Sequence, residues 1–140
     1  MAGWSLYLDH RGRATYLYNW FGHDLTTIDD PDPIEPGRRS VSVLYIHDGG
    51  FGAGGRAQLL VDDRVVGTAR IERTVPVRFS MSGETFDVGV DTGAPVGDYE
   101  PGFACTAEIV GVTLERLTEP DAETRRAVID GEFRASISTQ

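Results

Sequence analysis

Apolar side chains recur at every second position in several short runs of this chain. The clearest run covers residues 40–47, where Val41, Val43 and Tyr45 fall on one face of an extended backbone. Stretches rich in glycine, proline and aspartate, such as 29–37 and 49–55, separate the runs. Successive side chains of a β-strand point to opposite faces. The pattern therefore predicts half-buried strands joined by turns.

The number and spacing of these runs indicate the fold class. The candidate strands are residues 4–8, 14–18, 25–28, 40–47, 57–61, 65–71, 75–79, 85–88 and 104–117. Without a β-α-β alternation, they predict two packed antiparallel sheets over residues 1–117, although the spacing alone equally describes a closed barrel. Residues 118–140 change to helical spacing after Thr118 and Asp121, so we expect a short C-terminal helical segment on the same single domain.

Composition excludes several classes of protein. The 140 residues, 40% of them apolar, are typical of one globular domain. A formal charge of −9 disfavours nucleic acid and anionic membranes as partners, and no apolar run is long enough to span a bilayer. The single cysteine, Cys105, excludes an internal disulfide, and we expect it to be a small core residue. The first residues show no secretion signal, so a cytoplasmic location is the default expectation.

Residues 70–96 carry a family resemblance. They read R-I-E-R-T-V-P-V-R-F-S, then M-S-G, then E-T-F-D-V-G-V-D-T-G-A-P-V. This stretch resembles the C-terminal region of the large bacterial arylsulfatases, and segments 3–7, 18–22, 48–50, 60–62 and 119–140 are similar to the same region in the same order. The resemblance spans nearly the whole chain. It concerns the part of a sulfatase that lacks the catalytic chemistry.

A weaker resemblance bears on the choice between sandwich and barrel. The hairpin sequence L-L-V-D-D-R-V-V-G, followed by a late long strand after an aromatic residue, looks like concanavalin A-like jelly rolls of the lectin and laminin-G type. This resemblance implies a two-sheet β-sandwich of jelly-roll type.

The catalytic motif of sulfatases is missing. Those enzymes convert the first residue of C-x-P-S-R or S-x-P-S-R to formylglycine, whereas Cys105 is followed by T-A-E-I. The resemblance therefore implies a non-catalytic accessory, interaction or ligand-binding module. Its expected partner is a sulfatase catalytic domain, or a second copy through an apolar face.

A small enzyme, such as an isomerase, cyclase or hydrolase, is the alternative. Its candidate catalytic residues are His23, Asp24 and His47. Each histidine of the chain stands next to an aspartate, but adjacent residues of a strand point to opposite faces. An acid–base pair would therefore need an aspartate from another strand, and the plainer interpretation is polar residues at strand ends.

Two further sets of residues are candidates for binding. Asp48, Asp87 and Asp91 could supply oxygen ligands to calcium, which makes a calcium-assisted carbohydrate-binding module a third possibility; otherwise they are turn aspartates, and no other cofactor is expected. Trp4, Tyr7, Tyr18 and Trp20 could form a ligand platform, a core or an interface. Tyr7 alternates with Trp4, so both faces of that strand must be covered.

Overall fold

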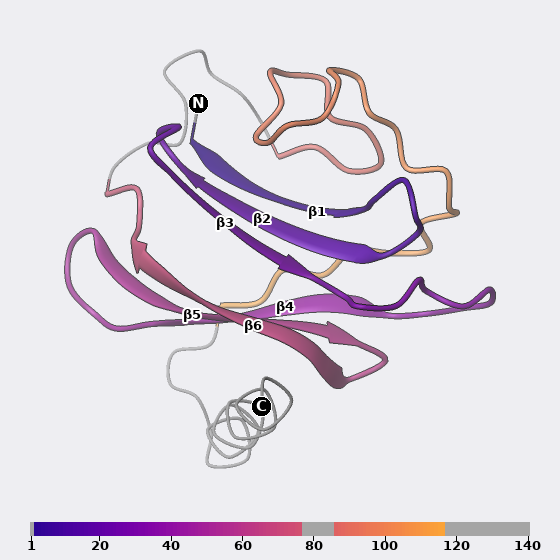
Figure 1. The fold of residues 1–140 in the computed structure, drawn as a ribbon, viewed down its shortest axis with the longest axis horizontal. Helices are drawn as coiled ribbons and strands as arrows, with labels where there is room; N and C mark the ends of the chain where they lie inside the picture. Colours follow the sequence, from indigo (N-terminus) through magenta and orange to yellow (C-terminus); the bar gives the residue numbers. More distant parts are fainter. Residues whose placement is uncertain (1, 77–85, 117–140) are drawn as a thin grey trace.

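The computed structural model describes residues 2–76 and 86–116, and these residues contain strands and no helix. The strands are β1 (Gly3–Leu8), β2 (Ala14–Trp20), β3 (Asp24–Asp29), β4 (Val41–His47), β5 (Ala53–Val61) and β6 (Arg64–Arg73). They form two antiparallel three-stranded sheets with the sequential orders β1-β2-β3 and β4-β5-β6 (Figure 1). The predicted all-β class is confirmed. The described chain accordingly offers no helix that could cross a membrane.

Short turns set the register of these hairpins. Asp62 and Asp63 connect β5 to β6 with φ angles of 49° and 62°, the left-handed geometry of a two-residue hairpin turn. Asp9 organises the turn between β1 and β2, because its carboxylate accepts the backbone N–H groups of Arg11 and Arg13 at 2.8 and 2.9 Å. Aspartate side chains thus replace backbone acceptors at this turn.

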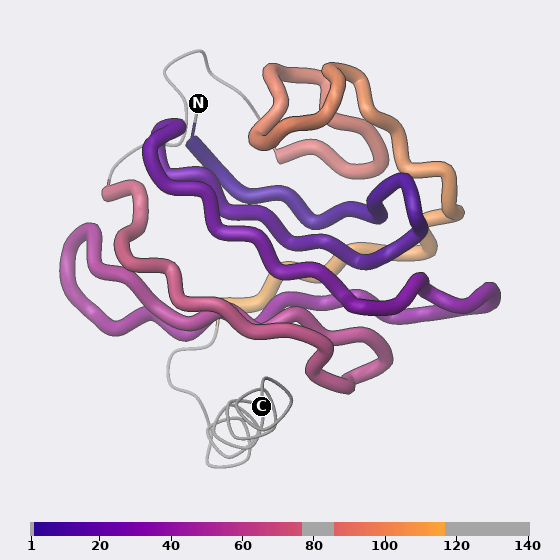
Figure 2. The backbone as a smooth tube through the Cα atoms, in the orientation of Figure 1, coloured from indigo at the N-terminus to yellow at the C-terminus, as the bar shows by residue number. Residues whose placement is uncertain are grey.

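The inner faces of the two sheets share one core. Its buried members are Ala14, Tyr16, Tyr18 and Ile28 from the first sheet and Ala57, Leu59 and Ile71 from the second. Figure 2 shows the two sheets as facing layers. The approach is closest between β3 and β6, where a Cβ on Gly67 would lie 2.5 Å from Cγ2 of Ile28. The core members of β2, which are Ala14, Tyr16 and Tyr18, follow the predicted period of two.

Residues 86–104 cover the outer face of the first sheet (Figure 1). Tyr7 packs there against Tyr99 and Phe103, with ring centroids 5.3 and 6.0 Å apart. Asn19 donates from Nδ2 to the carbonyl of Val96 at 2.6 Å. This cover explains why β2 is buried along six consecutive residues, Ala14–Asn19, although strands with one solvated face alternate.

Several predicted elements near the C-terminus differ from the structure. Residues 104–116 were expected within a strand, yet they are exposed and form no strand, apart from an isolated bridge between Val90 and Ala104. Alternation alone is insufficient, because a strand also needs a hydrogen-bonded neighbour. Cys105 is likewise exposed and lies outside the core.

Other predicted elements fall largely on undescribed residues. Of the predicted strands 75–79 and 85–88, the described residues 75, 76 and 86–88 are not in strands, and the rest lie outside the described ranges. The predicted helical segment 118–140 also lies outside them.

Candidate functional site

A cleft opens at one end of the space between the two sheets. It has a volume of about 460 Å³ and lies between the β2–β3 hairpin and the end of β6. Its polar and aromatic lining residues are Tyr18, Trp20, His23, Asp24, Thr26, Glu72 and Arg73. Four of these, Tyr18, Trp20, His23 and Asp24, are candidates that the sequence supplies. This volume falls within the range of small-molecule sites.

Strand pairing brings the lining residues together. Trp20 of β2 pairs with Asp24 of β3, and Tyr18 pairs with Thr26, so all four side chains stand on the inner face of the first sheet. Arg73 stands two residues after the buried Ile71 on β6 and therefore shares its inward face. The cleft is the unfilled end of the layer that elsewhere forms the core.

Arg73 joins the two sheets across this cleft. Its Nε and Nη2 atoms lie 2.9 and 2.7 Å from Oδ2 of Asp24. Its guanidinium carbon stands 4.0 Å from the centroid of the Trp20 ring, a cation–π arrangement. The sequence does not single out Arg73. The sequence signal that could have identified Arg73 is its spacing from Ile71. Because Arg73 follows Ile71 by two residues, its charge lies on the inward face of the strand.

The turn between β2 and β3 holds one wall of the cleft in a strained conformation. Phe21 and Gly22 have φ angles of 52° and 75°, and the N–H of His23 donates to the Trp20 carbonyl at 3.0 Å. A positive φ is uncommon for a bulky residue such as phenylalanine. Asn19 supports the turn, because its Oδ1 accepts the N–H of Gly22 at 2.7 Å. The Phe21 ring thereby meets the Trp20 ring edge-on at 5.4 Å.

The three candidate catalytic residues do not assemble into an acid–base group. His23 lies 5.9 Å from the Trp20 ring, while the adjacent Asp24 is engaged by Arg73. His47 does not line the cleft; its Nδ1 accepts the N–H of Gly49 at 3.0 Å. Among the described contacts, neither histidine is hydrogen-bonded to a carboxylate. The described residues therefore contain no oriented histidine–carboxylate pair of the kind used in general base catalysis.

Burial affects the ionisation of Tyr18, which lines the cleft, and of Tyr45, which lies outside its lining. Burial raises the pKa of Tyr18, while the hydrogen bond from the Val75 N–H at 2.9 Å acts in the opposite direction. Burial also raises the pKa of Tyr45 on the facing sheet to about 12. Since Tyr18 accepts from Val75 and keeps its proton, it can also act as a donor.

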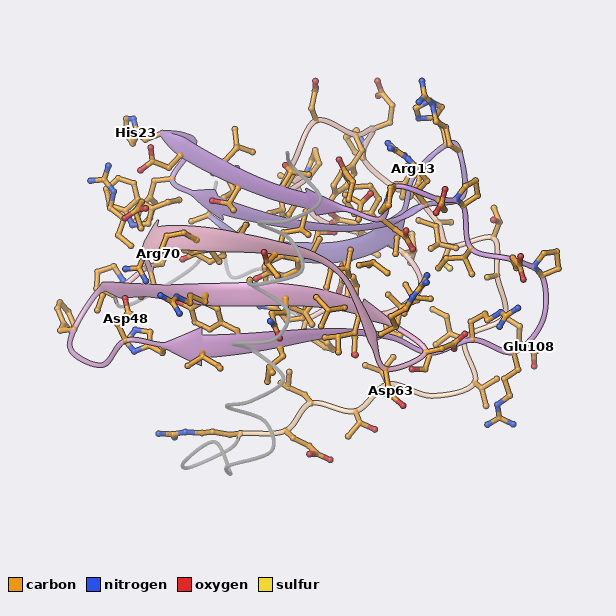
Figure 3. The ribbon with its side chains drawn as sticks, turned by 60° about the horizontal axis from the view of Figure 1, so that its bottom comes forward. Arg13, His23, Asp48, Asp63, Arg70 and Glu108 are labelled. Atoms are coloured by element: carbon orange, nitrogen blue, oxygen red, sulfur yellow. The ribbon has the colours of Figure 1, made fainter. Side chains whose placement is uncertain are left out.

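The three candidate calcium ligands stand in separate hydrogen-bond groups. Asp48 follows β4 and pairs with Arg70 at 2.6 Å, and this hydrogen bond lowers the pKa of Asp48 (Figure 3). Asp87 accepts from the N–H and hydroxyl of Thr92 at 2.8 and 2.6 Å. In the described part of the chain, no three metal-binding side chains gather at one point.

Asp91 has its own partners in the segment that covers the first sheet. Its Oδ1 accepts the N–H of Gly93 at 3.2 Å, and its Oδ2 accepts the Tyr99 hydroxyl at 2.8 Å. Asp87 and Asp91 therefore behave as turn aspartates. The structure does not bring them together with Asp48, which belongs to the second sheet.

The aromatic candidates divide between the cleft and other surfaces. Tyr18 and Trp20 line the cleft, whereas Tyr7 packs on the outer face of the first sheet. Trp4 lies 6.4 Å from the Tyr16 ring and 5.7 Å from the Phe86 ring. The four residues therefore do not form a single platform.

A second surface feature is an apolar strip in the segment after the bridge at Ala104. It consists of Ile109, Val110, Val112 and Leu114, whose exposed fractions range from 42% for Ile109 to 78% for Leu114. Val110, Val112 and Leu114 are spaced two residues apart, so their side chains lie on the same side where the backbone is extended. Contiguous exposed apolar residues of this kind are typical of interaction surfaces.

The fold and these two surfaces define an all-β protein of two facing antiparallel sheets with a cleft at one end and an apolar strip outside the sheets. No family model, curated protein or solved structure matches the chain.

Proposed function

We propose that this chain is a non-catalytic interaction module of the arylsulfatase C-terminal type. The carrying observation is the apolar strip, where Val110, Val112 and Leu114 are each more than half exposed. Leaving such side chains in water forgoes the free energy of burial, about 25 cal/mol per Å² of apolar surface. A partner that covers the strip would recover that free energy. The family resemblance supports a sulfatase catalytic domain as the partner.

The proposal includes a finer description of the fold, a β-sandwich of jelly-roll type. The buried cluster shared by Tyr16, Ile28, Leu59 and Ile71 supports two packed layers. The sequential strand order within each sheet is that of a meander, and it gives the jelly-roll order no support of its own.

Co-purification tests the interaction. The full chain is co-expressed with a tagged bacterial sulfatase catalytic domain that lacks its own C-terminal region, and the tagged protein is isolated. We expect the chain to co-elute, and we expect Val110→Asp and Leu114→Asp to abolish co-elution because each places a charge within the strip. Phe51→Asp is the matched control, since Phe51 is 81% exposed in a different loop.

Two outcomes would contradict the proposal. One is no association with the catalytic domain. The other is equal loss of association in the Phe51→Asp control. Light scattering of the chain alone measures self-association, and dimers lost in Leu114→Asp would instead assign the strip to a second copy of the chain.

A specific observation also favours a second candidate, a ligand-binding module. The cleft combines a half-buried indole, an ion pair and several polar groups within about 460 Å³. The small-enzyme alternative has less support, because His23 and His47 are not brought together with a free carboxylate. Calcium assistance is also weakly supported, since Asp48, Asp87 and Asp91 are engaged separately.

A further inference from the structure

The cleft between the sheets contains the groups that a small ring-shaped ligand needs. Trp20 and the buried Ile71 supply apolar surface, and Leu25 lies beside them. Asp24, Thr26 and Arg73 place acceptors and donors around that surface. Ligands with an apolar ring face and a polar rim match such a lining.

The charges in the cleft favour a neutral ligand. Its lining includes two carboxylates, Asp24 and Glu72, and one guanidinium, Arg73. Asp24 already neutralises Arg73 at 2.7 Å, and Glu72 lies 3.8 Å from Arg70 of the same strand. An anion would therefore find the guanidinium of the lining already paired, in a chain whose formal charge is −9. An organic cation would find one face of Trp20 already covered by Arg73.

The cleft is held ready by contacts from three parts of the fold. Asn19 links the strained Phe21–Gly22 turn to Val96 of the covering segment, with hydrogen bonds of 2.7 and 2.6 Å. Arg73 connects the opposite sheet to the same hairpin. Strained residues persist only where the surroundings fix them, and they are concentrated at functional sites. A preformed cleft loses little conformational freedom on binding.

One buried polar atom remains unsatisfied beside this cleft. The indole N–H of Trp20 is buried and has no acceptor among the described residues. A buried donor without a partner costs about 1–3 kcal/mol. Because this atom is closed off from solvent, a ligand oxygen reaches it only where the lining of the cleft shifts.

We propose that this cleft binds a neutral saccharide, seated against the part of the Trp20 ring that Arg73 leaves uncovered, with Asp24, Thr26 and Arg73 as its polar partners. Saccharide hydroxyls both donate and accept, and their ring C–H groups form the apolar face that an indole contacts. The site requires no calcium. The cleft and the apolar strip have no residue in common, so the saccharide proposal and the interaction proposal can fail independently of each other.

Binding to the full chain can be measured with a panel of sugars. Neutral probes are methyl glycosides of glucose, galactose, mannose and N-acetylglucosamine and their disaccharides; charged probes are glucuronate and galactose sulfate. Nitrogen–proton correlation spectra resolve the indole signals, because the chain has only two tryptophans, Trp4 and Trp20. We expect a neutral probe to shift the Trp20 signal saturably, in the presence of a chelator, while the Trp4 signal stays unchanged.

Two conservative variants test the polar partners. Asp24→Asn and Thr26→Val keep the side-chain shape, and each should weaken the affinity about tenfold or more, as expected for a lost hydrogen bond to a charged or buried group. Asp63→Asn is the matched control, because Asp63 stands in the β5–β6 turn at the opposite end of the molecule from His23 (Figure 3). It should leave the affinity unchanged.

Three results would overturn the saccharide site. The first is that no neutral probe shifts the Trp20 indole signal. The second is that only the charged probes bind. The third is that Asp63→Asn weakens binding as much as Asp24→Asn does. Circular dichroism of each variant establishes that a loss of binding is not a loss of fold.

Discussion

Arg73 of β6 and Asp24 of β3 lie 49 positions apart in the sequence and form an ion pair between the two sheets. The Nη2–Oδ2 distance is 2.7 Å, and the same guanidinium covers the Trp20 ring. The side chains are 52% and 48% exposed, so solvent screens their attraction. The contact therefore contributes little to the stability of the fold.

Replacement of Arg73 therefore has a modest effect on stability. Arg73→Ala should lower the free energy of unfolding by about 1 kcal/mol, the combined scale of an exposed ion pair and an exposed cation–π contact. A double-mutant cycle with Asp24→Asn, measured by urea unfolding, should give a coupling energy of about 0.5 kcal/mol that decreases with added salt. Arg64→Ala, on the same strand, is the control. A coupling energy of zero would contradict the expected contribution of the pair to stability.

The close approach of β3 and β6 gives a sharper test of the packed layers. In Gly67→Ala, the new Cβ would stand 2.5 Å from Cγ2 of Ile28 and 3.4 Å from the Asp29 carbonyl oxygen. Ile28 is buried, so the clash should cost about 1–3 kcal/mol in thermal or urea unfolding. Gly111→Ala is the control, because no atom lies near its Cβ position. Equal stability of the two variants would refute the facing arrangement of the sheets.

Local pattern was sufficient to predict the six strands of the two sheets, although not their exact bounds. Tyr16 and Tyr18 are two apart and both join the core between the sheets, whereas Leu17 lies beside Gly97 on the other face. The turn at Asp62 and Asp63 likewise follows from local chemistry, since aspartate tolerates positive φ better than most residues. The direction of successive side chains along a strand depends only on sequence position, so it can be predicted from the sequence.

Contacts between distant segments could not be predicted in the same way. Val110, Val112 and Leu114 alternate as well as any strand in the chain, yet no described segment pairs with them. Pairing depends on which edge lies nearby in space. The cleft has the same origin: four of its residues have local signals, but the partnership of Arg73 with Asp24 depends on how one sheet lies over the other.

Two tyrosines of the core differ in how their hydroxyls are satisfied. The Tyr45 hydroxyl is buried and has no partner among the described residues, whereas Tyr18 accepts the Val75 N–H at 2.9 Å. Tyr45→Phe should therefore be neutral or stabilising, within about 0.5 kcal/mol, since it removes a buried polar atom at little change of shape. Tyr18→Phe should cost about 1 kcal/mol, because it leaves the Val75 N–H unpaired. The reverse order in urea unfolding would contradict this assignment.

Calcium should leave the thermal midpoint unchanged. The carboxylates of Asp48, Asp87 and Asp91 are engaged by an arginine, backbone N–H groups and hydroxyls, and they do not share a site. A ligand at 100 times its dissociation constant would add about 2.7 kcal/mol of stability. Differential scanning calorimetry with millimolar calcium or with a chelator measures this directly. A saturable rise in the midpoint that disappears in Asp91→Asn would restore a calcium site in the covering segment.

The turn between β1 and β2 should make stability depend on pH in the acid range. Partial burial raises the pKa of Asp9, but backbone and side-chain hydrogen bonds from Arg13 and the Arg11 N–H outweigh it and lower the pKa from 3.8 to about 2. A carboxyl group whose pKa is lower in the folded state stabilises the fold above its unfolded pKa, and this contribution is lost as the pH falls through the folded value.

The matched variant for this effect is Asp9→Asn, which removes the titrating group and retains the side-chain shape. In urea unfolding, the parent protein should exceed Asp9→Asn in stability by a constant amount above about pH 4, and the difference should shrink toward pH 2. Arg13→Met removes the ion pair at 2.7 Å but leaves the backbone N–H donors, so its pH dependence should be intermediate. If the difference in stability persisted unchanged down to pH 2, the ionised Asp9 carboxylate would not be the source of the stabilisation.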